Sequence, residues 1–337
     1  MNARSRPRPP AILLAAFSAL LLAAGCMAGT TDSAGDGGDG GGKGPLVRIA
    51  LGVDASYAPL YLAKEEGLFE KAGLNVELMQ VEGGPAAAEA IVAGTAQISL
   101  NADSSALPLM ASSGGLRALG VFQESDRYLK VVLRDGVDGP QQIKTMASIQ
   151  GIGLYATHSY LRHHGIDPAS IKIVKSSPPE IPGILARGSV DGYILYEPWA
   201  AKGDADGGHI TARSGDFGIG YAQWVLAGTG WLESNRELAA KVFKVIADAD
   251  SRVTEDPEAA AQATQKQVRL PAEQTEKVLP EITFRARGFT PEDLSASRSL
   301  VDFLVQQKLI EKEPDLDTVL LKGWYEKYVG AGGAAGG

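Results

Sequence analysis

Short apolar runs alternate with helical patterns through the first half of the sequence, and this alternation limits the chain to few architectures. Runs typical of strands occupy residues 47–53, 75–81, 97–100 and 116–122. Between them, the spacing of apolar residues predicts helices, with glycines such as Gly73 and Gly94 at their ends. This order favours an open α/β sheet with helices on its faces. In such sheets, ligands bind beyond the carboxyl ends of the strands, where helices begin.

The same alternation starts again after residue 127. We expect strands at 128–134, 151–155, 171–174 and 192–196. Short helices are predicted between them, at 143–149, 158–164 and 179–187. After residue 227 the patterns predict a helical C-terminal region, with helices at 234–250, 257–268, 271–278, 291–307 and 314–329.

The folded part of the chain is longer than one hydrophobic core usually serves, so two lobes are expected. We assign residues 46–127 and 224–329 to lobe 1 and residues 128–223 to lobe 2. The chain then crosses between the lobes near 123–130 and near 213–227. These two crossings predict a two-strand hinge.

The N-terminus, residues 1–25, is typical of a secretory signal. Arginines precede the apolar run 11–24, which is shorter than the roughly 20 residues that span a bilayer. Small residues lead into Cys26, the only cysteine, in a pattern similar to a bacterial lipobox. We therefore expect an exported protein, lipid-anchored through Cys26 to the outer or periplasmic face of the cell membrane; the alternative is an ordinary signal with an incidental cysteine. The glycine-rich residues 26–45 predict a flexible tether, and residues 330–337 a disordered tail.

Charge and motif content exclude several classes of function. The formal net charge of −8 makes nucleic acid an unexpected partner. The histidines do not place three side chains on one face, so neither a metal nor another cofactor is expected; they are His158, His163, His164 and His209. The sequence also lacks a GxSxG elbow and a Walker loop. We expect a protein that is not an enzyme.

Three predicted loops between a strand and a helix are candidate ligand contacts: 54–57, 82–85 and 101–105. Each presents backbone N–H groups at a helix start, a geometry that suits an anionic group. Hydroxyl and amide side chains in these loops can add hydrogen bonds; they are Ser56, Asn101, Ser104 and Ser105. Alternatively, Ser56 and Ser104 only cap helices. Asp103 is either a ligand acceptor or a capping residue.

Several segments in a fixed order resemble one known family. The first is Tyr57–Phe69 (YAPLYLAKEEGLF); Leu74–Leu78, Gly83–Pro85, Leu100–Ser104 and Glu197–Trp199 follow. This series is similar to the nitrate/sulfonate/taurine and pyrimidine-precursor binding proteins of the NMT1 type. The resemblance implies a type II periplasmic-binding-protein fold. It also implies a monomeric substrate-binding lipoprotein that delivers a small, anionic molecule to the permease and ATPase subunits of an ABC transporter.

The resemblance also points to ligand-binding residues. It implies contacts from Glu82, Gly83 and Gly84, and from Glu197 and Trp199 on the opposite lobe. Trp199, with Tyr57 or Phe122, would cover an apolar or ring part of the ligand, while Glu197 would accept from an amine or amide. A packing role for Trp199 is the alternative.

The sequence departs from the family pattern in the second lobe. A small-residue loop is usual there, whereas this chain has Tyr155–Ser159 (YATHS). We expect Thr157, His158 and Ser159 to replace the usual anion contacts, or the site to be altered. An exported enzyme related to pyrimidine synthases and a sensor lipoprotein are the alternative functions of such a cleft.

Overall fold

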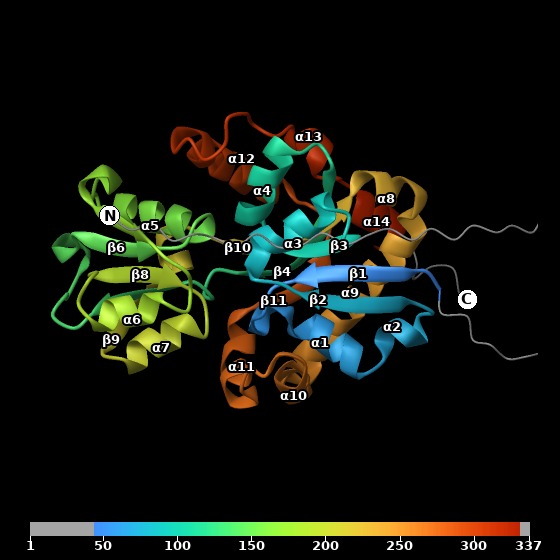
Figure 1. Ribbon diagram of the computed structural model, residues 1–337, viewed down its shortest axis with the longest axis horizontal. Helices are drawn as coiled ribbons and strands as arrows, with labels where there is room; N and C mark the ends of the chain where they lie inside the picture. The colour runs from blue at the N-terminus through green and yellow to red at the C-terminus, as the bar shows by residue number, and fades with distance from the viewer. Residues whose placement is uncertain (1–43, 331–337) are drawn as a thin grey trace, which may run out of the picture. The chain divides into compact units, whose positions relative to one another are not determined.

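The computed structural model describes residues 44–330, which form two mixed sheets flanked by helices (Figure 1). The predicted signal, Cys26, most of the tether and residues 331–337 of the predicted tail lie outside this range. The α/β class expected from the sequence is confirmed. Within residues 44–330, no helix is both long and apolar enough to cross a membrane.

The first sheet has six strands in the order β11-β4-β10-β3-β1-β2. β1 lies between β2 and β3 and is parallel to both, while β10 runs antiparallel to β3 and β4. The strands are β1 (Leu46–Leu51), β2 (Asn75–Gln80), β3 (Ile98–Ala102), β4 (Leu116–Ser125), β10 (Tyr221–Gly228) and β11 (Thr283–Arg287).

The second sheet has five strands in the order β7-β6-β8-β5-β9. β6 is parallel to β7 and β8, whereas β5 is antiparallel to β8 and β9. The strands are β5 (Lys130–Arg134), β6 (Thr145–Ser148), β7 (Lys172–Lys175), β8 (Gly192–Leu195) and β9 (Gly208–Arg213). The chain therefore passes between the sheets twice, at 126–129 and at 214–220.

Helices cover both faces of the first sheet (Figure 1). One face carries α1 (Ala58–Glu65), α2 (Leu68–Lys71), α9 (Arg236–Glu255), α10 (Pro257–Val268), α11 (Ala272–Val278) and α14 (Trp324–Tyr328). The other side carries α3 (Gly83–Val92), α4 (Asp103–Ser112), α12 (Pro291–Gln306) and α13 (Leu316–Val319), and α8 (Thr229–Ser234) follows β10. The second sheet packs against α5 (Ile152–His163), α6 (Ile181–Ala186) and α7 (Trp199–Ala205).

The alternation of side chains along β1 explains this layering. Val47, Ile49 and Leu51 are fully buried in the core beneath α1 and α9. Ala50 points to the opposite face, where it packs against Ala87 of α3. A strand that is buried on both faces is typical of parallel sheets covered by helices. Short 3₁₀ turns complete the chain: η1 (Ala55–Tyr57), η2 (Pro140–Gln142), η3 (Pro168–Ser170), η4 (Ser214–Phe217) and η5 (Leu279–Glu281).

Two predicted elements of the second sheet are wrong. Residues 143–149, predicted as a helix, contain β6, because that segment pairs with a strand on each side. Residues 151–155, predicted as a strand, form the first turn of α5. The buried residues Ile152, Ala156 and Tyr160 recur at helical spacing, which the short apolar run concealed. Strands β9, β10 and β11 were not among the predicted strands. β10 begins within the predicted crossing at 213–227, and β11 interrupts the expected helical region.

Candidate ligand-binding cleft

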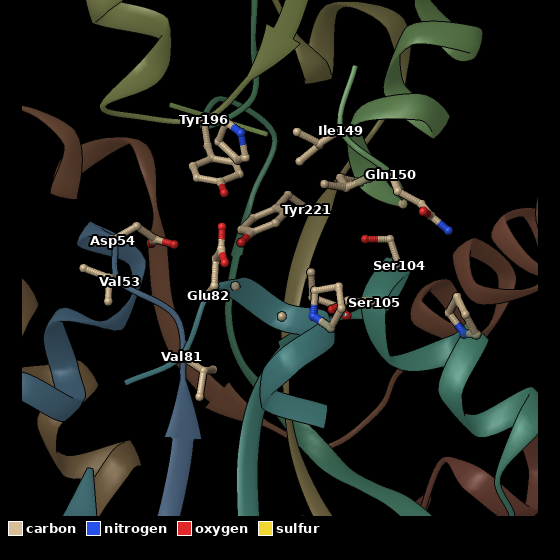
Figure 2. A pocket seen from close by; sticks show the side chains of 18 of the residues that line it. Val53, Asp54, Val81, Glu82, Ser104, Ser105, Ile149, Gln150, Tyr196 and Tyr221 are labelled. Atoms are coloured by element: carbon tan, nitrogen blue, oxygen red, sulfur yellow. Dashed lines mark hydrogen bonds between the residues drawn. The ribbon is translucent and has the colours of Figure 1, made fainter. Parts of the chain in front are cut away.

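A cavity of ≈ 870 Å³ lies where the first and second sheets face each other (Figure 2). Its volume is in the range of small-molecule sites in proteins. Residues from the first sheet and its helices include Asp54, Tyr57, Gln80–Pro85, Ser104, Ser105 and Tyr221. The second sheet and its loops supply Ile149–Ile152, Ser176, Pro178, Pro179, Tyr196 and Trp199.

Three helices begin at the wall of this cavity. Gly83 and Gly84 start α3, Ser104 lies in the first turn of α4, and Gly151 immediately precedes α5. Gly151 has φ 78°, which a residue with a side chain rarely adopts, and it lies against the backbone of Ser104. The starts of α4 and α5 therefore lie close together, although α4 packs on the first sheet and α5 on the second. Helix N-termini carry partial positive charge, and three of them meet at the wall of this cavity.

A buried carboxylate occupies one corner of the cavity. Asp54 follows β1 and is only 7% exposed. Its Oδ1 accepts hydrogen bonds from the Ser56 N–H at 2.7 Å and from the Tyr128 hydroxyl at 3.3 Å. Burial raises the pKa of Asp54, and these hydrogen bonds oppose the rise only in part. Tyr128 also stacks on Tyr196, with ring centroids 6.0 Å apart.

The sequence model of the NMT1-like family matches residues 42–267, more than half of the chain. The chain belongs to the NMT1-like family. A Bacillus subtilis (strain 168) protein named as an aliphatic sulfonates-binding protein is 22% identical over 319 residues, which cover 91% of this chain and 93% of that protein. The taurine-binding periplasmic protein of Escherichia coli (strain K12) is 24% identical over 170 residues, 49% of this chain and 53% of that protein.

Solved structures of periplasmic binding proteins have a similar fold. The periplasmic aliphatic sulphonate binding protein SsuA from Escherichia coli gives a TM-score of 0.73 at 18% identity and covers 82% of this chain and 92% of its own. The periplasmic nitrate-binding protein NrtA from Synechocystis PCC 6803 gives 0.71 at 12% identity, with 86% and 89% covered. The periplasmic-binding-protein fold expected from the resemblance is confirmed.

Half of the ligand-binding residues predicted for this NMT1-like chain line the cavity. They are Tyr57, Glu82, Gly83, Gly84, Ser104, Ser105 and Trp199. All but Trp199 come from strand-to-helix loops of the first sheet, as the chain order of the motifs implied. Trp199 comes from the start of α7 on the second sheet, so it faces the others across the cavity.

Four other predicted residues lie behind the wall of the cavity. Ser56 is fully buried and accepts from the Gln223 amide at 2.7 Å. Asn101 donates to the Gly84 carbonyl, so it holds the start of α3. Phe122 is buried behind Tyr57, with ring centroids 6.4 Å apart. Asp103 accepts from the Ser104 N–H at 2.6 Å, and burial raises its pKa to about 7. These four side chains support the lining residues.

The three remaining predicted residues lie on the second sheet and its helices, away from the lining. Thr157 donates back to the Gly153 carbonyl inside α5. His158 packs edge-on against Phe303, and burial lowers the pKa of its imidazole. Glu197 is buried and forms an ion pair with Lys130 at 2.6 Å. The segment of α5 that meets the cavity is its start, at Gly151 and Ile152, and not residues 157–158.

Sequence reasoning missed Asp54, Gln150, Tyr196 and Tyr221 as lining residues. Asp54 had a signal, since it opens the first predicted loop. Tyr196 ends the predicted strand 192–196 directly before Glu197. No sequence signal pointed to Tyr221. It lies on β10, which follows the strands of the second sheet in sequence but pairs within the first sheet.

Proposed function

We propose that this protein is the extracytoplasmic solute-binding component of an ABC importer. The observation that carries the proposal is the cavity between the two sheets, walled by three helix N-termini in a chain of the NMT1-like family. The solute is a small molecule of the sulfonate, taurine, nitrate or pyrimidine-precursor type, and its anionic or polar group lies against the helix starts. No chemical step is assigned to the cleft.

The two crossings at 126–129 and 214–220 act as the hinge of this binding protein. Closure of the two lobes buries the solute between Trp199 on one side and Ser104 on the other. The closed form is the one that the permease and ATPase subunits recognise. Because a ligand that binds only the folded protein stabilises it, binding is measurable as a rise in melting temperature.

A thermal-shift screen of sulfonates, nitrate, taurine and pyrimidine precursors tests the proposal. We expect one class to give a saturable rise in melting temperature. Trp199→Ala should weaken binding about tenfold or more, because an aromatic wall is a major source of binding free energy. The matched control is Trp231→Ala on α8, which lies outside the cavity and should bind as the unchanged protein does. Equal binding by both variants would contradict the assigned cleft.

We further propose that the mature protein is held at the membrane by a lipid on Cys26. The small residues before this cysteine and the apolar run at 11–24 support the assignment. Cys26→Ala should release the protein into the medium or periplasm, as measured by fractionating cells and blotting each fraction. Retention of the variant in the membrane fraction would contradict lipidation.

A further inference from the structure

The charged residues that line the cavity are all acidic. Asp54, Glu82 and Glu89 contribute to the wall, and its lining includes no lysine, arginine or histidine. A ligand that carries only negative charge would gain from the helix starts but would be repelled by these carboxylates. A purely anionic ligand therefore does not explain why the cavity is lined by three carboxylates.

Four side chains converge on one corner of the cavity. Figure 2 shows Asp54, Glu82, Tyr196 and Tyr221 directed toward a common space, with Ser104 and Gln150 on the other side of Tyr221. Asp54 and Glu82 come from loops after β1 and β2, whereas Tyr196 comes from the second sheet. The corner is therefore assembled from both sheets.

Asp54 lacks a counter-charge in this corner. Within residues 44–330, no ion pair includes Asp54 or Glu82. Asp54 is 7% exposed, and a buried carboxylate is costly unless a cation pairs with it. Capping η1 does not account for the charge, because the neutral side chain of serine or asparagine caps equally well.

Tyr196 and Tyr221 line the same space, and the buried ring of Tyr128 packs behind them. Tyr128 stacks on Tyr196 at 6.0 Å and lies 5.8 Å from Tyr221, measured between ring centroids. The hydroxyl of Tyr196 forms no hydrogen bond with the described residues and points into the corner. Faces of tyrosine rings attract organic cations, and carboxylates supply the full charge that such cations need.

We propose that the solute carries a positively charged nitrogen, and that Asp54 and Glu82 bind it within this tyrosine-lined corner. The proposal rests on the function proposed above and specifies the substrate class. A protonated amine or a cationic nitrogen heterocycle fits the corner. A metal ion does not, because the described residues hold no group of three His, Cys, Asp or Glu side chains able to bind one. The starts of α4 and α5 line another part of the cavity and suit an anionic or polar group at the other end of the solute.

Isothermal titration with matched pairs of probes tests this assignment. The pairs are taurine and isethionate, choline and its uncharged tert-butyl analogue, and an aminomethylpyrimidine and the matching hydroxymethylpyrimidine. Each pair keeps size and differs in the positive charge. We expect the positively charged member of at least one pair to bind about thirtyfold tighter or more than its partner, as expected for a desolvated charge pair.

Three variants locate the effect. Asp54→Asn should remove most of the preference within the pair, and Glu82→Gln, at an exposed position, should reduce it without affecting folding. Asp250→Asn is the matched control, since Asp250 is also a buried carboxyl but lies on α9 outside the cavity. Its affinity should stay within about twofold of the unchanged protein. If Asp54→Asn does not fold, the proposal is judged by whether Glu82→Gln reduces the preference for the positively charged probe.

The outcomes separate the two proposals. If uncharged or purely anionic probes bind as tightly as their positively charged partners, and Glu82→Gln leaves affinity unchanged, the inference is wrong while the binding function stands. If no probe binds, charged or uncharged, the proposed function is contradicted and the inference with it.

Discussion

Asp250 shows how a single buried carboxyl contributes to the pH dependence of stability. It lies on α9, is 1% exposed and, within residues 44–330, takes part in no ion pair. Burial raises its pKa well above the ordinary value of 3.8. The folded protein therefore binds more protons at this site than the unfolded chain does. Stability from this group is highest below the unfolded pKa and falls as the pH rises toward the folded pKa.

We therefore predict that Asp250→Asn stabilises the protein at neutral pH. The gain should grow from pH 4 upward, by about 1.4 kcal/mol for each unit by which burial raises the pKa. Urea denaturation of both proteins between pH 4 and pH 8 measures the difference. Parallel stability curves at all pH values would show that Asp250 does not titrate with a raised pKa.

Residues that line the cleft differ in how far sequence reveals them. Glu82, Gly83 and Ser104 follow strands of the first sheet, so their place at the strand ends follows from local pattern alone. Tyr221 depends on β10 inserting between β3 and β4, which no local pattern encodes. Side chains brought in by a long-range strand pairing are therefore the ones that sequence reasoning loses.

At the scale of elements, the wrong assignments of β6 and of the start of α5 explain why the ligand contacts from the second sheet were predicted at the wrong residues. The segment Thr145–Ser148 has little β propensity of its own and is a strand because neighbours pair with it on both sides. Taking it as a helix made residues 151–155 the next strand. The loop expected at the cleft then fell at Thr157 and His158, although the true helix start lies at Ile152. Mistaking one strand for a helix, and the start of the next helix for a strand, thus displaced the predicted site by about one helical turn or more.

The first sheet was predicted more fully, for a physical reason. Its helices α2 and α3 each end at a turn that contains a glycine, and these residues, Gly73 and Gly94, adopt positive φ. These breaks separate strands whose apolar runs are buried on both faces, as β1 is. Local signals and tertiary structure agree in this region, whereas in the second sheet they conflict.

At the scale of the whole molecule, a buried charge network joins the two sheets beside the crossings. The ammonium group of Lys130, on β5 of the second sheet, lies 2.6 Å from Glu197 Oε1 and 2.7 Å from Glu281 Oε2. Glu281 belongs to η5, which leads into β11 of the first sheet. The hydroxyl of Tyr128 lies 3.2 Å from the Glu197 carbonyl oxygen and 3.3 Å from Asp54 Oδ1, so these two acceptors share its one hydrogen. The network therefore runs from the cleft to the crossings between the two sheets.

This arrangement predicts that Lys130→Met is strongly destabilising. The change leaves the buried carboxylate of Glu197 without its cation and leaves Glu281 with only Arg213, at 3.6 Å. Breaking a buried ion pair in this way typically costs about 3–5 kcal/mol. Lys277→Met is the control, because Lys277 pairs with Glu273 on the surface and such pairs contribute about 1 kcal/mol or less. Urea denaturation at pH 7 measures both. If Lys130→Met loses no more stability than Lys277→Met, the charge network does not hold the sheets together. The contact between the sheets must then rely on apolar packing around Tyr128 and Tyr221.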